Sequence, residues 1–215
     1  MTQPLAGLLE GRQLACKRGR RLLFDSLDIR LEPATLTWLR GTNGSGKTSL
    51  LRILAGLSAP SDGAVLWNGQ PLRAAGASAR AGLLYIGHAN ALKDDLSLLE
   101  SLAFLVRLAG LSDAPARAES ALQQLGLGAQ KNLAVRLLSQ GQRRRGALAR
   151  LALDEQPRAW LLDEPFDSLD DAGTQALATL IEAHVARGGA VLFTSHQAPR
   201  LTGLREHLLQ SRAIA

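Results

Sequence analysis

Eight consecutive residues early in the chain have the types and spacing needed to hold phosphate groups. Residues 41–48 read Gly-Thr-Asn-Gly-Ser-Gly-Lys-Thr and fit the pattern G-x-x-x-x-G-K-[ST]. Glycines let the backbone wrap a phosphate with its N–H groups pointing inward, and the start of a following helix adds positive potential. Lys47 is expected to neutralise the outer phosphates, and Thr48 to offer an oxygen to Mg²⁺. The candidate phosphate contacts are Gly41, Thr42, Asn43, Gly44, Ser45, Gly46, Lys47, Thr48 and Ser49.

Two adjacent carboxylates later in the chain complement this loop. Residues 160–164 read Trp-Leu-Leu-Asp-Glu, so both acids follow a short apolar run that is typical of a buried strand. Ligands of α/β sheets bind at the carboxyl ends of the strands. Asp163 is therefore expected to hold Mg²⁺, and Glu164 to polarise an attacking water. Taken alone, the pair also fits a helix cap beside a surface acid.

Short apolar runs alternate with helical patterns along most of the chain. Strands are predicted at residues 22–31, 35–40, 64–67, 82–86, 160–162 and 191–194, with a hairpin turn at Asn68-Gly69. Helices are predicted at residues 47–55, 139–153 and 177–185. Residues 92–138 are rich in Leu and Ala at helical spacing, which predicts a small helical lobe. Alternating strands and helices predict an α/β domain with a mainly parallel sheet.

Length, charge and cysteine content limit the classes of protein to which this chain can belong. The 215 residues suit one domain with a large core. The formal charge of +6 fits a nucleic acid, an anionic membrane face or an anionic ligand as partner, or simply a basic surface. A single cysteine, Cys16, excludes an internal disulfide and fits a reducing compartment. No apolar stretch is long enough to span a bilayer, and residues 1–11 are not expected to act as a signal peptide.

Five residues near the middle of the chain resemble LSGGQ, the signature sequence of ABC ATPases. Residues 138–142 read Leu-Ser-Gln-Gly-Gln, with Gln140 in place of the first glycine. Alone, the segment also fits a helix cap with Ser139 as the N-cap residue. The helix that follows resembles the same family. Its run of three arginines, residues 143–145, is expected on the solvated face of that helix rather than in a nucleic-acid patch.

Two further segments resemble elements of this family and occur in the expected order. Residues 168–170, Ser-Leu-Asp, resemble the D-loop, and residues 194–196, Thr-Ser-His, resemble the switch segment whose histidine touches the γ-phosphate. The resemblance covers about residues 8–200. It implies a P-loop NTPase core of the ABC-ATPase type, in which helices flank a mainly parallel sheet, with a small antiparallel β subdomain and a helical subdomain. Residues 1–215 would then form a single nucleotide-binding domain, with the helical subdomain at about residues 90–140.

The resemblance implies an ATPase that works as a pair. Two copies would sandwich two ATP molecules, and each site would combine the P-loop of one chain with Ser139, Gly141 and Gln142 of the other. Hydrolysis would drive an integral membrane subunit on a separate chain. No nucleic-acid partner is expected, because ABC ATPases that act on DNA or ribosomes usually carry two cassettes or a long coiled coil. The expected catalytic residues are Lys47, Glu164 and His196.

Two positions depart from the family pattern. A glutamine that senses the γ-phosphate is expected near residue 88, where the sequence reads Tyr-Ile-Gly-His at residues 85–88. We take His88 as its substitute, since a neutral imidazole also bonds to water or a metal-bound oxygen. An aromatic residue that stacks on adenine is expected near residue 18, where Lys-Arg-Gly stands instead. Arg18 becomes the candidate adenine contact, because a guanidinium plane stacks on a base.

Several segments resemble one group within the family, the haem-exporter ATP-binding subunits of bacterial cytochrome c maturation. They are residues 65–72, 85–88, 163–166 and 195–197. This resemblance implies haem-handling partners and a place on the cytoplasmic face of the bacterial inner membrane. The alternatives are a subunit for another cargo, a soluble ATPase associated with nucleic acid, and an inactive regulator. The presence of Lys47, Asp163, Glu164 and His196 opposes the last of these.

Overall fold

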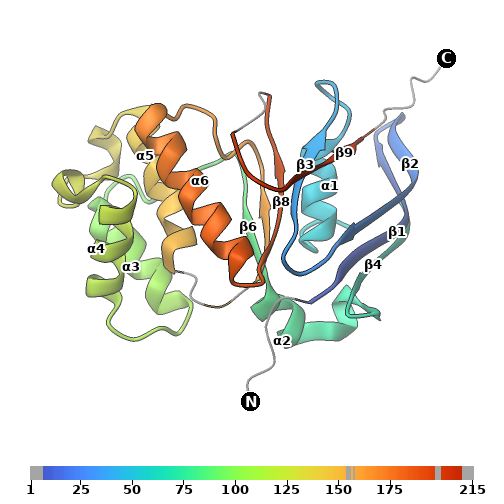
Figure 1. Cartoon of the computed structure of the whole chain (residues 1–215), viewed down its shortest axis with the longest axis horizontal. Helices are drawn as coiled ribbons and strands as arrows, with labels where there is room; N and C mark the ends of the chain where they lie inside the picture. Colours follow the sequence, from blue (N-terminus) through green and yellow to red (C-terminus); the bar gives the residue numbers. More distant parts are fainter. Residues whose placement is uncertain (1–6, 154–155, 157, 197–199, 210–215) are drawn as a thin grey trace. The chain divides into compact units, whose positions relative to one another are not determined.

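The computed structural model describes residues 7–153, 156, 158–196 and 200–209, and Gln197, part of one sequence resemblance, lies outside this set. Two compact units make up the chain (Figure 1). The first falls within residues 1–87, 156–165 and 183–215, and the second within residues 88–155 and 166–182.

A five-stranded sheet forms the centre of the first unit. Its order is β6-β7-β8-β3-β9, and each pair of neighbours is parallel, as predicted. The strands are β3 (Leu36–Arg40), β6 (Leu83–Ile86), β7 (Ala159–Leu162), β8 (Ala190–Thr194) and β9 (Leu204–Leu208). Every residue of β7 and β8 is buried. This double-sided burial is why they read as continuous apolar runs instead of alternating ones.

A smaller antiparallel sheet belongs to the same unit, in the order β2-β1-β4-β5. Its strands are β1 (Leu9–Arg18), β2 (Arg21–Leu31), β4 (Asp62–Trp67) and β5 (Gln70–Pro71). Between β4 and β5, Asn68 and Gly69 have φ values of 51° and 79°. A two-residue hairpin turn needs these left-handed conformations, and Asn and Gly adopt them most readily. The predicted hairpin is therefore confirmed.

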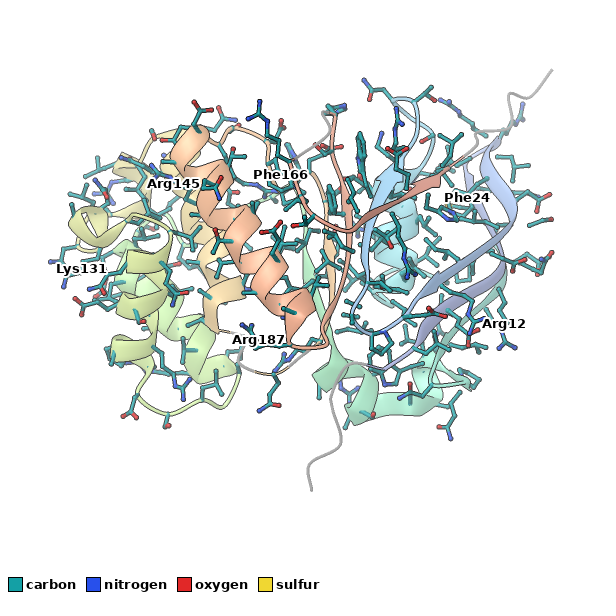
Figure 2. The ribbon with its side chains drawn as sticks, viewed as in Figure 1. Arg12, Phe24, Lys131, Arg145, Phe166 and Arg187 are labelled. Atoms are coloured by element: carbon teal, nitrogen blue, oxygen red, sulfur yellow. The ribbon has the colours of Figure 1, made fainter. Side chains whose placement is uncertain are left out.

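Helix α1 (Lys47–Leu54) follows β3 and is anchored by its apolar side chains. Leu50, Leu51, Ile53 and Leu54 are each at most 1% exposed. They join a core cluster that includes Phe24 of β2 (Figure 2). Burying each such side chain contributes roughly 1.5–3 kcal/mol to the free energy of folding. This packing holds α1 in place behind the glycine-rich loop. Helix α2 (Leu72–Gly82) also belongs to this unit.

The second unit is helical, as the Leu- and Ala-rich stretch predicted. It contains α3 (Leu98–Leu108), α4 (Ala114–Gln124), α5 (Gln140–Leu148) and 3₁₀ turns at Gly128–Gln130, Val135–Leu137 and Ala149–Leu153. Helix α6 (Asp171–Ala186) begins in this unit and ends in the first. Helix α3 starts with a capping box, in which Ser97 accepts from the backbone N–H of Glu100 and the Glu100 carboxylate accepts from that of Ser97.

The prediction that residues 143–145 lie on a solvated face is wrong for Arg144, and Arg143 and Arg145 are only partly exposed. Arg144 is only 3% exposed, and its Nη1 donates to the backbone oxygen of His88 over 3.4 Å. The Nη1 of Arg145 donates to the backbone oxygen of Leu125 over 3.4 Å. The carbonyl of Leu125 ends α4 and has no partner within that helix, whereas the carbonyl of His88 belongs to the loop after β6. The arginines thus hold the helical unit together.

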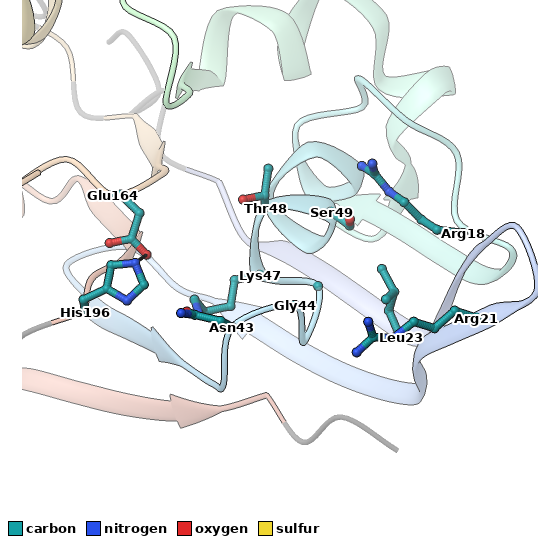
Figure 3. A pocket seen from close by; sticks show the side chains of 11 residues that line it. Arg18, Arg21, Leu23, Asn43, Gly44, Lys47, Thr48, Ser49, Glu164 and His196 are labelled. Atoms are coloured by element: carbon teal, nitrogen blue, oxygen red, sulfur yellow. Dashed lines mark ion pairs between the residues drawn. The ribbon is translucent and has the colours of Figure 1, made fainter. Parts of the chain in front are cut away.

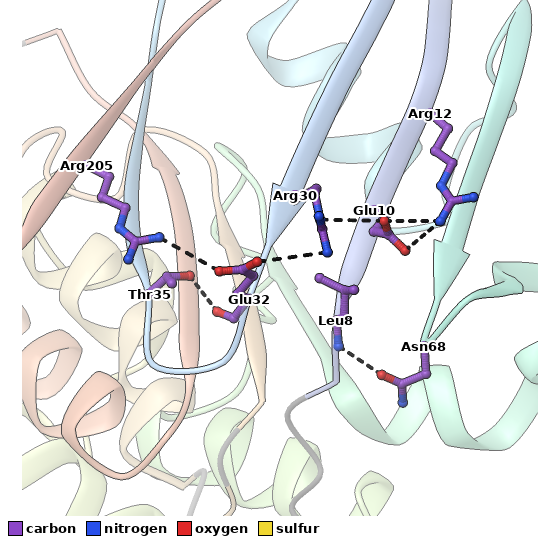
Figure 4. A network of polar contacts seen from close by, with 8 residues as sticks. All are labelled: Leu8, Glu10, Arg12, Arg30, Glu32, Thr35, Asn68 and Arg205. Carbon is purple, nitrogen blue, oxygen red and sulfur yellow. Dashed lines mark hydrogen bonds and ion pairs between the residues drawn. The ribbon is translucent and has the colours of Figure 1, made fainter.

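A chain of charged side chains runs across strands of the first unit (Figure 4). Glu10 of β1 is 6% exposed and lies 3.3 Å from Arg12 and 3.6 Å from Arg30. Glu32 continues the chain at 3.9 Å from Arg30 and 4.0 Å from Arg205 of β9. The arginines are mostly exposed, and exposed pairs contribute about 0–1 kcal/mol each. The apolar core therefore stabilises this unit more than its ion pairs do.

Among the helices in the part of the chain that the structure describes, none combines the length and apolar character needed to cross a membrane.

Candidate nucleotide-binding site

The glycine-rich loop connects the end of β3 to the start of α1. Gly44 and Gly46 have φ values of 78° and 101°, a region that other residues rarely adopt. At Gly46 a Cβ atom would lie 3.1 Å from side-chain atoms of Leu23 and Phe24. Both the conformation and the close packing therefore require glycine at position 46. The backbone N–H of Ser45 donates to the carbonyl of Thr42 over 3.1 Å, which tightens the turn.

Lys47 lies at the mouth of this loop. Its ammonium group donates to the carbonyl oxygens of Gly41, at 2.9 Å, and Thr42, at 3.4 Å. The first turn of α1 contains no acidic residue, so nothing in that turn offsets the positive end of the helix. The loop therefore presents a lysine and a helix start in one place, which is the arrangement that favours a phosphate group.

Asp163 connects three elements around the loop. It follows β7, is 2% exposed, and its Oδ1 accepts from the hydroxyls of Thr48, at 3.1 Å, and Thr194, at 3.0 Å. Its backbone N–H donates to the carbonyl of Ile86 over 2.9 Å. The carboxylate predicted to hold Mg²⁺ thus lies beside the hydroxyl predicted to do the same. The alternative of a surface helix cap does not fit its burial.

Glu164 and His196 face each other beside the loop (Figure 3). Glu164 Oε1 lies 3.6 Å from His196 Nε2. The backbone of Glu164 has φ 48°, and its N–H donates to the hydroxyl of Thr194 over 2.8 Å. This hydrogen bond holds the left-handed turn that follows β7. The Glu164 side chain is 14% exposed, so it retains access to water.

Lys47, Glu164 and His196 all line one cavity, whose volume is about 550 Å³. That volume is within the roughly 300–1,000 Å³ typical of small-molecule sites. Arg18, the predicted adenine contact, lies in the lining, while Gly41, Thr42 and Ser45 shape the loop beneath. The cavity is lined by Arg18, Arg21, Leu23, Asn43, Gly44, Gly46, Lys47, Thr48, Ser49, Glu164 and His196.

The remaining predicted site residues belong to the second unit. The Ser139 hydroxyl accepts from the backbone N–H of Gln142 over 3.2 Å, and the Gln142 side chain accepts from that of Ser139 over 2.9 Å. This capping box confirms Ser139 as the N-cap of α5. A Cβ atom at Gly141 would lie 2.8 Å from the carbonyl oxygen of Ser168, so glycine allows this close approach.

His88 lines a second, smaller cavity of about 150 Å³ within the helical unit. Its backbone oxygen accepts from Arg144, whose Nη1 also lies 3.4 Å from Oδ1 of Asn90. Asp167 and Ser168 line the same cavity. The segment resembling the D-loop and the start of α5 therefore border the loop that carries His88.

Sequence reasoning gave no role to three residues of the larger site, namely Thr194, Arg21 and Leu23. Thr194 organises both Asp163 and Glu164, and its signal is a hydroxyl residue at the carboxyl end of an apolar strand. Arg21 lines the large cavity together with Leu23, but an exposed arginine in a hairpin carries no distinctive pattern.

Two residues with reactive side chains, Cys16 and His184, are buried away from the cavity. Cys16 is 7% exposed, and burial raises the pKa of its thiol, which therefore stays neutral. His184 is fully buried and stacks on Trp160, with 3.6 Å between ring centroids. Neither side chain lines the cavity.

Comparison with known proteins agrees with this geometry. The model of the family described as ABC transporter matches residues 24–167. The chain is 44% identical over 201 residues to the cytochrome c biogenesis ATP-binding export protein CcmA of Albidiferax ferrireducens, covering 94% of this chain and 95% of that protein. Proteins of the same description from Nitrosomonas europaea and Pseudomonas aeruginosa are 45% and 46% identical over 190 residues. That length covers 88% of this chain, and 89% and 93% of those proteins.

Solved structures share the same fold. An ATP-binding subunit of an ABC transporter matches with a TM-score of 0.77 at 26% identity, covering 88% of this chain and 79% of that one. A putative ABC transporter ATP-binding protein from Pyrococcus furiosus matches with a TM-score of 0.80 at 21% identity, covering 94% and 97%. Together with the family match and the relatives above 40% identity, these findings establish that the chain belongs to the ABC transporter family, within its group of cytochrome c biogenesis ATP-binding export proteins.

Proposed function

We propose that this chain is the ATP-hydrolysing subunit of an exporter of cytochrome c biogenesis, and that it works in pairs to drive a separate integral membrane subunit. Family membership implies ATP binding and pairing with membrane subunits. We assign to the complex the export of haem or the release of a haem chaperone, with haem-handling proteins as further partners. The observation that carries the proposal is the convergence of Lys47, Thr48 and Glu164 on one cavity.

Three residues carry the hydrolysis in this proposal. Lys47 neutralises the outer phosphates, Glu164 polarises the attacking water, and His196 contacts the γ-phosphate. General-base assistance contributes roughly 10²–10⁴-fold to such a reaction. The 3.6 Å between Glu164 Oε1 and His196 Nε2 supports this assignment, because the imidazole can orient the carboxylate as well as reach the phosphate.

Thr48 and Asp163 fit a Mg²⁺ site. Both offer oxygen ligands, and the hydroxyl and carboxylate oxygens lie 3.1 Å apart. Mg²⁺ in proteins is usually held through one or two carboxylates, with phosphates and waters completing its coordination. When bound, the ion supplies charge neutralisation on the β- and γ-phosphate oxygens. Thr194 positions Asp163 for this role through its own hydroxyl.

A second copy of the chain completes each site in this proposal. Ser139, Gly141 and Gln142 lie at the start of α5, where backbone N–H groups and the helix dipole favour an anion. Because the Ser139 oxygen accepts from Gln142, its hydroxyl proton is available to donate to a phosphate. His88 takes the place of the γ-phosphate-sensing glutamine, and its loop is supported by Arg144.

Residues 1–215 act as one nucleotide-binding domain, with a helical subdomain at about residues 90–140. The domain lies peripherally on the cytoplasmic face of the bacterial inner membrane, next to its membrane subunit. No nucleic acid is expected among its partners. Arg18 lines the cavity where the base is expected, and we assign it as an adenine contact.

Paired substitutions test the ATPase mechanism. Glu164→Gln keeps the shape of the side chain but removes the base, so this variant should bind ATP, cease turnover and accumulate as a dimer with ATP and Mg²⁺. Lys47→Ala should bind ATP weakly and form no such dimer. Light scattering with ATP and Mg²⁺ measures the dimer directly. A Glu164→Gln protein that stays monomeric at saturating ATP would contradict the sandwich.

Gene deletion in the native host tests the biological role. Haem staining of membrane proteins should lose the signal of covalently attached haem, and wild type should restore it while Glu164→Gln should not. An unchanged haem signal after deletion would reject the role in cytochrome c biogenesis. The ATPase assignment would then stand, and the copurifying membrane protein would indicate another cargo.

A further inference from the structure

One end of the large cavity is formed by two arginines from a single hairpin. Arg18 is the last residue of β1 and Arg21 the first of β2, and the two are paired across the strands. Both line the cavity together with Leu23 (Figure 3). Arg20 lies in the turn between them and, unlike these two arginines, does not line the cavity.

The opposite end of the cavity contains the residues that we propose to act on the phosphates. Glu164 and His196 lie there, and Lys47 and Thr48 lie between them and the hairpin (Figure 3). A nucleoside triphosphate with its terminal phosphate beside Glu164 must direct its base toward the hairpin. Arg21 also reaches over the glycine-rich loop, since its Nη atoms lie 3.7 and 3.8 Å from the position of a Cβ atom on Gly44.

The chemistry at the hairpin end differs from that of an aromatic platform. Among the described lining residues, none is Phe, Tyr or Trp. A guanidinium plane stacks on any base, and it offers hydrogen-bond donors but no acceptor. Guanine presents two acceptors, O6 and N7, on one edge, whereas adenine presents N7 and the N6 amino donor. Two arginines therefore complement the guanine edge fully and the adenine edge only in part.

We infer that the site accepts guanine nucleotides at least as well as adenine nucleotides, with Arg18 and Arg21 as the base contacts. This inference rests on the proposed nucleotide-binding function. A bidentate arginine contact to O6 and N7 gives about fivefold or greater discrimination between bases. The chain should consequently bind and hydrolyse GTP in addition to ATP, through the same Lys47 and Glu164.

Competition binding on the full chain tests the inference. A fluorescent ribose-labelled ATP is bound in EDTA, which prevents turnover, and is displaced by ATP, GTP and ITP. ITP keeps O6 and N7 but lacks the 2-amino group of guanine, so it should behave like GTP. We expect dissociation constants for GTP and ITP at or below that for ATP. Arg18→Gln and Arg21→Gln should weaken GTP and ITP about fivefold more than ATP.

Arg20→Gln is the matched control, because it removes the same charge from the same turn outside the cavity, and its dissociation constants should equal those of wild type. The inference is overturned if the dissociation constant of wild type for ATP is measurably lower than its dissociation constants for GTP and ITP. It is also overturned if Arg18→Gln and Arg21→Gln weaken all three nucleotides equally, since the arginines would then contact phosphates. If Lys47→Ala leaves binding of every nucleotide unchanged, the proposed nucleotide site itself fails.

Discussion

His184 gives this protein a stability that depends on pH. The imidazole is fully buried, and its plane lies within 13° of the Trp160 ring. Its Nε2 is 2.9 Å from the carbonyl oxygen of Arg158 and 3.4 Å from the backbone nitrogen of Arg158. Because the nearer carbonyl oxygen can only accept, we assign the proton of the neutral ring to Nε2. Among the described residues, Nδ1 has no hydrogen-bond partner. A second proton would therefore be buried without a partner, and this burial lowers the pKa of His184 to about 4.

The size and sign of the effect follow from the two pKa values. In the unfolded chain the imidazole titrates near 6.5, whereas in the folded chain it titrates at about 4. Between these values the unfolded state binds more protons, so stability falls as the pH falls. The contribution is fully present above pH 6.5 and is lost on acidification to pH 4. At about 1.4 kcal/mol for each pKa unit, the total loss is about 3 kcal/mol.

Urea unfolding followed by far-ultraviolet circular dichroism measures this loss. Wild type is compared with His184→Phe, which keeps a flat ring against Trp160 but binds no proton. The variant loses the bond to Arg158, so it should be less stable above pH 6.5, and the gap should shrink by about 3 kcal/mol toward pH 4. Carboxylates titrate equally in both proteins and cancel in the difference. A gap that stays constant across this range would refute the reasoning.

Two other substitutions give expected outcomes on stability and metal dependence. Gly63→Ala should lower the free energy of unfolding by about 2 kcal/mol more than Gly69→Ala. Both glycines have positive φ, but only at Gly63 would a Cβ atom meet the backbone, 2.3 Å from the carbonyl oxygen of Gln13. Equal losses of unfolding free energy for the two variants, measured by urea unfolding, would contradict this account. Asp163→Asn should raise the Mg²⁺ concentration needed for half-maximal ATP turnover by about tenfold or more. An unchanged Mg²⁺ dependence would remove Asp163 from the metal site.

Local patterns in the sequence made much of the fold predictable. The strand before the glycine-rich loop and the buried strand before Asp163 were recognised because both are continuous apolar runs next to polar residues of defined type. The hairpin at Asn68-Gly69 was recognised because few residue pairs adopt two left-handed conformations.

Three elements escaped prediction for identifiable reasons. Strand β1 contains irregular register shifts, which disrupt the alternation of apolar residues. Strand β9 is an edge strand with charged, exposed residues, so it lacks an apolar pattern. Helix α2 contains Gly76 at φ 53°, which interrupts helical periodicity.

The sequence by itself predicted a phosphate site, because residues 41–48 and the acids at 163 and 164 are recognised from local order and residue type. Only the tertiary structure decided which residues from other parts of the chain surround this site. It placed Thr194 between Asp163 and Glu164, since parallel strands distant in sequence share one carboxyl edge. It also buried Arg144 and turned Arg21 into the cavity. The partners of a long cationic side chain depend on which loops fold beside it, and no local pattern encodes that.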